Sequence, residues 1–505
     1  MAHLTRQQLL RAMTALGAGA AAQSQAPAAA ARAQARTLIR GANIVTMDPA
    51  QGELHDVDVL IDKGRIAAIG KGLSASDAHM VNASSMILMP GMADGHRHIW
   101  QCVESGRVVK TNHRDFSANY QIWKMKWMPC ATAQDHEFIA YYGGLQAIDS
   151  GVTALVDHAH GHHTADRTLA AARGLQASGV SGWYAHQVSH TIDYGPGDTL
   201  SLAHASKQAG AFTDDSHWEA MRRLRAEVFS GSSDLLQLGM ALSVGSQGQP
   251  IERVKTEEFI PGRRMGVGLI TFHANRIPPY PAGRFGHRGI GIRDLHEAGL
   301  LADDVHCSHG VGLSDDELGL MRQTGAMLCA TCMAETFPRN AQARRDPAMA
   351  RGRKAGVRTG IGIDAPLAMT SDYFEHIRAS YYLMSQHEES AAIVADYTSN
   401  DLLDVATRAG YDAINLGGVA GQVKVGQRAD LVLLSTDRPG FPTAGSLADR
   451  VVNYAARSDI DSVWVAGRLR KSGGRMIGVD WKVMNAKLAV IQERIHRQAQ
   501  TITFV

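Results

Sequence analysis

The sequence predicts an α/β protein, a (β/α)8 TIM barrel with a small β-sandwich domain formed from both chain ends. Short β-rich runs begin at Thr37 and return after Gly426, and between them short apolar runs alternate with helix-like segments. Alternating strands and helices favour a parallel sheet with the helices outside. The roughly 335 residues of the middle region can hold eight such units with long loops.

The first β-rich region contains three strand-like runs, TLIRGANIVTM, VDVLIDKGRIAAIG and SSMILMPG, with a turn at Lys63-Gly64. The runs LVLLS and DSVWVAGRLRKSGG near the C-terminus have the same β-rich composition. Such runs, bounded by glycine turns, are typical of short antiparallel strands. We expect residues 36–88 and 426–475 to pair into one β-sandwich.

The middle region repeats a strand followed by a helix. GVTALVD precedes ADRTLAAARGLQASG, and VGLITFHA precedes IRDLHEAGLLADD. This repeat predicts a barrel over residues 89–425. The final segment, residues 476–505, contains WKVMNAKLAVIQERIHRQAQ, which predicts a C-terminal helix.

The overall composition excludes several classes of partner. The chain has 505 residues, with 51 Lys and Arg against 49 Asp and Glu, so its net charge of +2 does not favour nucleic acid. No apolar run of about 18 residues follows the N-terminal region, so we expect no membrane span. A small-molecule substrate is the expected partner. The sequence leaves open whether the protein forms a homo-oligomer. The 23 histidines point to a metal, because neutral imidazole is a common metal ligand.

Residues 1–35 resemble an export signal. Arg6 and Arg11 precede a weakly apolar stretch, and Ala33-Gln34-Ala35 forms an A-x-A cleavage pattern. The stretch around Arg6 is similar to a twin-arginine signal in which Gln7 replaces the second arginine. We therefore expect a signal peptide and a periplasmic protein.

The strongest chemical motif is PGMADGHRH, where an apolar strand ends in His96 and His98. Residues two apart on a strand point to the same face, so both imidazoles can converge on one point. Three later strands also end in candidate ligands: TFHA in His273, VHCSH in His306 and His309, and GIGID in Asp364. The C-terminal strand ends of a parallel barrel gather at one rim, where these side chains can meet.

These motifs, with the closing GQVKVGQRADLVLL, resemble the amidohydrolase superfamily, in its branch of deaminases and s-triazine chlorohydrolases. The resemblance covers residues 37 to about 475. It implies that His96, His98, His273 and Asp364 bind a metal and that Asp364 is also the catalytic base. It further implies that His306 assists by hydrogen bonding to the water or to the developing oxyanion.

We expect one divalent ion, because the bridging carboxylated lysine of binuclear members has no counterpart in LGMALSVGSQ or VGLITFHA. Zinc is the expected metal for three histidines and one aspartate with an open position, with Fe²⁺ or Mn²⁺ as alternatives. A second histidine cluster, residues 158–163, follows GVTALVD. It indicates a lining of the active site or a solvated loop rather than a second metal site.

The chain departs from its relatives after the third histidine. Deaminases of this branch have H-x-x-E, whose glutamate protonates the substrate ring, whereas here Arg276 occupies that position. An arginine cannot be a general acid at neutral pH, but it can hold a carboxylate. Gln101 and Trp100 are further candidates for substrate binding, and Glu335 is the candidate substitute acid.

Our first hypothesis is therefore a metal-dependent hydrolase that cleaves a C–N bond other than a peptide bond. Its substrate would be an amide, lactam or amidine in a small molecule that can carry a carboxylate. The alternative is a deaminase or chlorohydrolase of a nitrogen heterocycle. A third hypothesis, a non-catalytic ligand-binding relative, conflicts with the retention of all four ligands.

Overall fold

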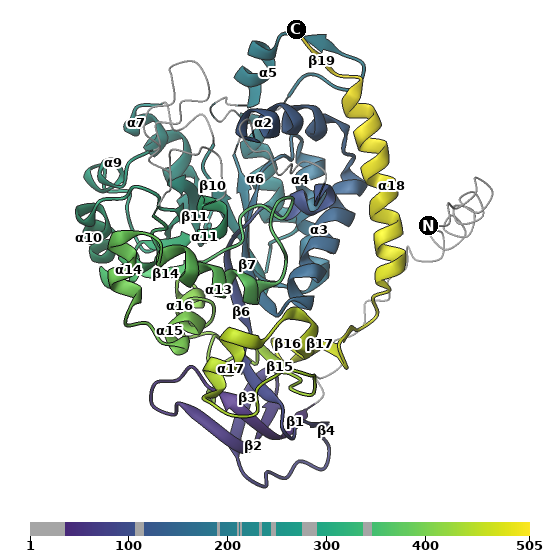
Figure 1. Ribbon diagram of the computed structural model, residues 1–505. Coiled ribbons are helices and arrows are strands. Elements are labelled where there is room, and N and C mark those ends of the chain that lie inside the picture. The colour runs from purple at the N-terminus through teal and green to yellow at the C-terminus, as the bar shows by residue number, and fades with distance from the viewer. Residues whose placement is uncertain are drawn as a thin grey trace, which may run out of the picture.

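The computed structural model shows a barrel with a second sheet at one end (Figure 1). The signal-like segment and Arg276 lie outside the residues that it describes. Those residues are 36–106, 116–188, 192–209, 212, 215–231, 235–243, 249–274, 290–336 and 346–505.

Eight parallel strands form the barrel wall within the described residues. Most of their side chains are buried, as expected for a parallel sheet covered by helices. The end of the first strand meets the segment after the last one. There the His98 amide donates to the Asp364 carbonyl (2.9 Å) and the Asp364 amide donates to the His96 carbonyl (2.8 Å). In sheet order the strands are β6 (Met92–Arg97), β7 (Val152–Ala159), β8 (Ser181–Gln187), β10 (Leu236–Ala241), β11 (Ile270–Ala274), β12 (Val305–His309), β13 (Met327–Ala330) and β14 (Arg358–Ile361).

Helices surround the barrel, and several begin at the caps that their sequence predicts. Thr132 and Asp135 form a capping box for α3 (Ala133–Asp149), and Ser314 and Glu317 do the same for α10 (Asp315–Thr324). The other major helices are α2 (Phe116–Trp127), α4 (Ala165–Ser178), α5 (Leu202–Ala209), α6 (Asp215–Glu227), α13 (Tyr373–Met384), α17 (Leu447–Tyr454) and α18 (Trp481–Gln500).

Shorter helical segments complete the connections. They are η1 (Ile99–Glu104), η2 (Met128–Cys130), α7 (Ile251–Val254), η4 (Lys255–Phe259), α8 (Ile260–Arg264), α9 (Ile292–Glu297), α11 (Cys332–Thr336), α12 (Met349–Lys354), α14 (Glu388–Val394), α15 (Ser399–Asp404), α16 (Arg408–Asp412) and η5 (Arg457–Asp459).

The two chain ends pair into one mixed sheet, as predicted. β15 runs antiparallel to β5, with Val432 opposite Met89, so the C-terminal strands extend the N-terminal ones. The expected domain boundary after residue 88 falls inside β5. The strand order is β18 (Arg475–Met476), β17 (Arg468–Ser472), β16 (Ile460–Val465), β15 (Leu431–Leu434), β5 (Ile87–Pro90), β1 (Thr37–Val45), β2 (Glu53–Asp62) and β3 (Arg65–Gly70), and β4 (His79–Asn82) pairs with β1.

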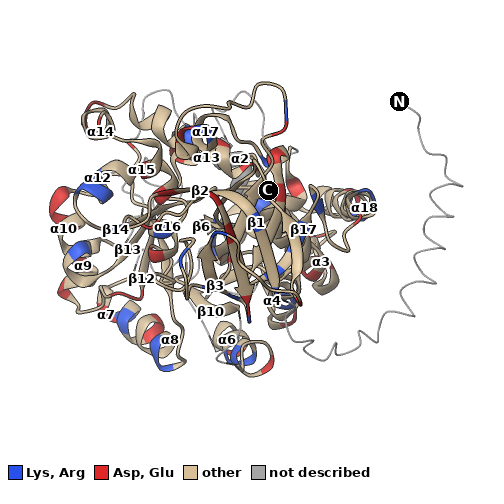
Figure 2. Ribbon diagram, turned by 90° about the horizontal axis from the view of Figure 1, so that it is seen from below, with Lys and Arg blue, Asp and Glu red and all other residues tan. Residues whose placement is uncertain are grey.

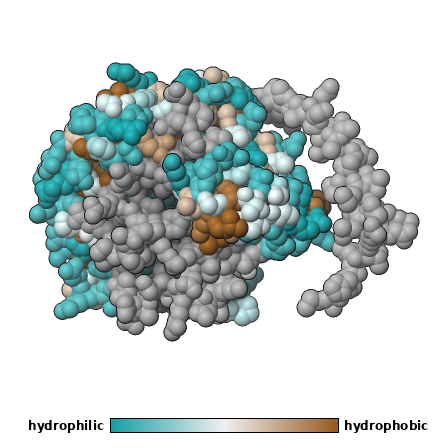
Figure 3. Space-filling view, turned by 90° about the horizontal axis from the view of Figure 1, so that it is seen from above, coloured by the Kyte–Doolittle hydropathy of each residue, from teal (hydrophilic) through white to brown (hydrophobic). Residues whose placement is uncertain are grey.

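The C-terminal helix α18 runs along the side of the barrel beside α3 (Figure 1). After it, β19 (Thr503–Phe504) pairs with β9 (Thr199–Leu200). Charges of both signs are interspersed over the outer helices (Figure 2). Seen from above, the described surface is mostly hydrophilic, with one compact apolar patch (Figure 3). In the described part of the chain, no helix is long and apolar enough to cross a membrane.

Candidate active site

The two histidines of the first barrel strand converge with Asp364 at one point. His96 and His98 are both buried, and Asp364 Oδ1 lies 3.4 Å from His96 Nε2 and 3.2 Å from His98 Nε2. His273 Nε2, from β11, lies 3.4 Å from His98 Nε2. A tetrahedral zinc site with bonds of ~2.0–2.1 Å has ligand–ligand distances of ~3.3–3.4 Å. These three distances therefore suit ligands of one divalent metal ion.

The remaining ring nitrogens are held by neighbouring groups. His98 Nδ1 donates to the carbonyl of His158 (2.9 Å), and His96 Nδ1 lies 2.8 Å from Ser308 Oγ. Such contacts select the tautomer whose other nitrogen, Nε2, offers a lone pair to a metal. Among the described residues, His96 Nε2 has no hydrogen-bond partner although it is buried.

Burial keeps the imidazoles of His98 and His273 neutral, as metal binding requires. It lowers the pKa of His98 and lowers that of His273 well below its usual value. Burial acts in the opposite direction on Asp364, but the neighbouring imidazoles of His96 and His98 hold the pKa of its carboxyl well below the usual range. The centre thus combines neutral nitrogen donors with one carboxylate.

Two residues at the rim adopt backbone conformations that are unusual for residues other than glycine. Asp364 has φ of 65° and His309 has φ of 73°. Each such conformation costs on the order of 1–3 kcal/mol and persists only where surrounding contacts impose it. At Asp364 those contacts are the two main-chain hydrogen bonds with β6.

His309 lies closer to the centre than the histidine that the sequence favoured. Its ring centroid is 5.1 Å from that of His96 and 5.2 Å from that of His273. His306 points into the barrel interior, where its Nδ1 lies 3.0 Å from Thr271 Oγ1. The positive φ of His309 turns its side chain toward the rim, so His309 is better placed than His306 for the assisting role.

Glu335 hydrogen-bonds to Thr331, which in turn contacts His309. Its Oε1 accepts hydrogen bonds from the Thr331 amide (2.7 Å) and hydroxyl (3.3 Å), and it lies 3.8 Å from His309 Nδ1. Thr331 Oγ1 is in turn 2.7 Å from His309 Nδ1. This chain of contacts orients His309 and places Glu335 as a supporting group for it.

Trp100 and Gln101, the other candidates for substrate binding, are both buried in η1. Trp100 stacks with Trp123 (centroids 5.9 Å apart), and its Nε1 donates to His160 Nδ1 (3.0 Å). The structure thus places Trp100 in an aromatic cluster that orients His160. Gln101 follows the ligand His98, whose carbonyl accepts from its amide.

The second histidine cluster is not a solvated loop, because all four of its histidines are buried. His158 and His160 lie beside the centre, with His158 4.2 Å from His273 and His160 4.1 Å from His98 between ring centroids. His162 turns away, toward His136, and the two Nδ1 atoms are 3.0 Å apart. His158 and His160 therefore line the centre, in agreement with the expected lining of the active site.

Sequence reasoning missed Lys124, a partly buried cation on α2. Burial lowers the pKa of its ammonium group to about 8, and its charge in turn lowers the pKa of His158 and His160. A lysine beside the centre can pair with an anionic group of a substrate. No motif marks this residue, since it lies on a helix outside every strand-end pattern.

Comparisons with known proteins point to one family. A family model described as the Amidohydrolase family matches residues 282–470. The chain is 23% identical to a 5'-deoxyadenosine deaminase of Methanosarcina acetivorans, over 92% of this chain and 99% of the relative. It is 26% identical to a hydroxydechloroatrazine ethylaminohydrolase of Pseudomonas sp. (strain ADP), over 78% of this chain and 82% of the relative.

Solved structures share the fold. A zinc-bound adenosine deaminase from Xanthomonas campestris has a TM-score of 0.72 at 19% identity and covers 91% of this chain and 98% of its own. A mutant atrazine chlorohydrolase from Arthrobacter aurescens TC1, complexed with zinc and atraton, has a TM-score of 0.73 at 18% identity. It covers 90% of this chain and 100% of its own.

Proposed function

The chain belongs to the amidohydrolase superfamily, and on that premise we propose that it removes an amino or alkylamino group from a nitrogen heterocycle. Hydrolysis through a divalent metal is common to both of our hypotheses, and amide hydrolysis and deamination both cleave a non-peptide C–N bond. The curated relatives favour the alternative, deamination of a heterocycle, over our first expectation of an amide, lactam or amidine. The observation that carries the proposal is the set of ligand-atom distances among His96, His98, His273 and Asp364.

Zinc is the metal that we propose, because the donor set fits it and the similar deaminase and chlorohydrolase structures contain it. A divalent ion held by these four residues supplies Lewis-acid activation of water at neutral pH. The protein's own groups then orient the reactants and move protons.

Asp364 is the proposed base. Its carboxylate accepts a proton from water while the water oxygen bonds to the ring carbon that carries the amino group. Nδ1 of His309 donates to Thr331, so its Nε2 is left as an acceptor that orients the same water. Asp364 then passes its proton to the departing nitrogen. The C–N bond breaks, ammonia or an amine leaves, and the ring carbon keeps the oxygen.

A panel of substrates tests this proposal. The zinc-reconstituted enzyme is assayed with aminopurine nucleosides, alkylamino-triazines, chlorotriazines and matched amides and lactams. We expect release of ammonia or amine from at least one heterocycle, abolished by Asp364→Ala. Turnover of amides alone would contradict the proposal, and chloride release without amine release would favour dechlorination.

Amide or lactam hydrolysis remains the second candidate, because Arg276 occupies the position of the ring-protonating glutamate. If Arg276 binds a substrate carboxylate, Arg276→Ala should lower kcat/KM for a carboxylated substrate by roughly ten- to a hundred-fold. The matched substrate without a carboxylate should be unaffected. Equal losses on both substrates would mean that Arg276 does not recognise the carboxylate.

A further inference from the structure

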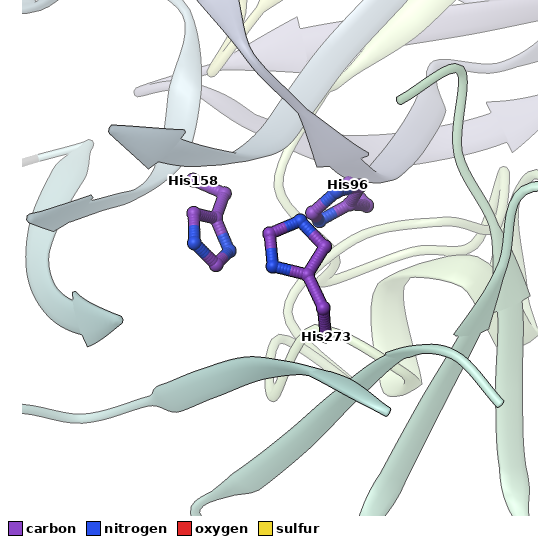
Figure 4. Close-up of side chains that lie close together, drawn as sticks. All are labelled: His96, His158 and His273. Carbon is purple, nitrogen blue, oxygen red and sulfur yellow. The ribbon is translucent and has the colours of Figure 1, made fainter. Parts of the chain in front are cut away.

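His158 lies at the metal centre although it is absent from the ligand motifs. It belongs to β7, a strand that contributes none of the four ligands above. Figure 4 shows its ring facing that of His273, with His96 on the next strand. Nitrogen atoms of His96, His158 and His273 all lie within 4.8 Å of one another. His96, His98 and Asp364 form a second group that meets the same limit.

The two groups overlap at His96, and this overlap limits what they can bind. Ser308 occupies His96 Nδ1, so only Nε2 of His96 is available as a ligand. Two ions cannot both use that single lone pair. The two groups therefore mark overlapping positions for one ion, and not two separate metal sites.

A second observation concerns the His158 ring itself. Its Nδ1 is buried and has no hydrogen-bond partner in the part of the chain that the structure describes. A buried nitrogen that is left without a partner costs free energy, and native structures rarely tolerate it. A metal ion at the centre would satisfy this nitrogen together with His96 Nε2.

We propose that His158 is a ligand of the same metal ion, in addition to His96, His98, His273 and Asp364. The inference rests on the metal centre of the proposed function but not on the identity of the substrate. Zinc coordination can expand beyond four ligands, so a further imidazole donor would raise the coordination number of the centre. The extra donor also predicts that the centre retains an ion when one of the motif ligands is removed.

The first test compares His158→Ala and His158→Gln with the control His160→Ala. His160 is equally close to the centre and buried on the same strand end, but it belongs to neither ligand group. His98 keeps its hydrogen bond in the His158 variants, because the acceptor is the main-chain carbonyl. Zinc affinity is measured by competition with a chromogenic chelator, and the visible spectrum of the Co²⁺-substituted protein reports coordination number.

We expect both His158 variants to bind zinc about ten- to a hundred-fold more weakly than the wild type, with a changed Co²⁺ spectrum. His160→Ala should differ little in either measurement. Wild-type zinc affinity in both His158 variants would overturn the proposal. An equal loss in His160→Ala would overturn it too, because the effect would then come from general disruption of the strand end.

The second test removes a motif ligand. Asp364→Asn should retain close to one zinc per chain at saturating metal, whereas Asp364→Asn combined with His158→Ala should lose it. Loss of zinc from Asp364→Asn alone, with no further loss in the double variant, would contradict the proposal. Both tests measure metal and not turnover. A chain that binds zinc through His158 but acts on no heterocycle would refute the proposed function alone.

Discussion

At the scale of single residues, the site depends on side chains that a strand's alternation alone does not place. His306 and Ser308 follow the alternation of side chains along β12 and point into the barrel. At His309 the positive φ breaks this alternation. The next residue, Gly310, also has positive φ (74°). The His309-Gly310 step is the sequence signal that could have identified the turn toward the rim.

Substitution of the two histidines separates their roles. His309→Asn should lower kcat by about a hundred-fold, the usual cost of misplacing a reactant by about 1 Å, with zinc content unchanged. Asparagine is the appropriate replacement because it tolerates positive φ. His306→Asn is the matched control and should change kcat far less. The reverse ranking, from steady-state kinetics on the same substrate, would restore His306 to the assisting role.

The partly buried charge of Lys124 predicts a pH-dependent effect on stability. The pKa of Lys124 falls from 10.5 to about 8 on folding, so the folded state disfavours its charged form. This penalty is complete below pH 8 and disappears as the pH rises to 10.5. Lys124→Met should therefore raise the thermal midpoint relative to the wild type at pH 7, and the gain should shrink by pH 10.

Lys126→Met, on the same helix, controls for the loss of a charge from that region. The thermal midpoints of all three proteins are compared at both pH values. A gain for Lys124→Met that is the same at pH 7 and pH 10 would show that the substitution acts through packing and not through the lysine charge.

At the scale of elements, a buried ion pair joins the strand that carries two ligands to the segment that carries a third. Asp94 and Arg97, both on β6, are fully buried, and Arg97 Nε donates to Asp94 Oδ2 (2.7 Å). Asp94 Oδ1 accepts from the amide of Ile363, the residue before Asp364 (3.2 Å). The Asp94 carboxylate thus connects β6, the first barrel strand, to the segment that follows the last one. We call this junction the barrel seam.

Neutralising that carboxylate should be costly. Asp94→Asn removes the carboxylate that accepts a hydrogen bond from the buried Arg97 guanidinium, and breaking a buried ion pair typically costs about 3–5 kcal/mol. We expect a lower unfolding midpoint and weaker zinc binding. Asp77→Asn is the control, because its ion pair with Arg36 is exposed and such pairs contribute about 0–1 kcal/mol. Equal midpoints for the two variants would mean that the seam does not depend on this pair.

At the scale of the whole molecule, a second buried ion pair connects the barrel to the sheet formed by the chain ends. Asp149 is the last residue of α3, and its Oδ1 lies 3.0 Å from Nζ of Lys471 on β17. Both side chains are buried, at 5% and 4% exposure, and Arg457 also contacts Asp149. The C-terminal sheet therefore binds the barrel through charge as well as through apolar packing.

A double-mutant cycle measures this connection. Asp149→Asn should lower stability by about 3–5 kcal/mol, because the Lys471 ammonium stays buried without its partner. Asp149→Asn with Lys471→Met should recover much of that loss, since the uncompensated charge is gone. Unfolding of both variants and of Lys471→Met alone gives the coupling energy. Additive losses would show that the two side chains do not interact.

The secondary-structure elements and the four candidate ligands could be predicted from the sequence alone. Strand-end histidines two apart, a later strand-end histidine and an aspartate predicted His96, His98, His273 and Asp364, and the structure brings them together. The pairing of the two chain ends was also predictable, because β-rich runs with glycine turns occur at both. These features follow from local periodicity, which a strand or helix carries in its own residues.

Only the tertiary structure decided which other side chains reach the centre. The rings of His309 and His158 lie beside those of His96 and His273 because the barrel brings these strand ends together. Trp100, expected to stack on a substrate, packs against other tryptophans instead. Local sequence patterns predict the direction in which a side chain points from its own strand. They do not predict the distances between strand ends, because those depend on the packing of the whole barrel.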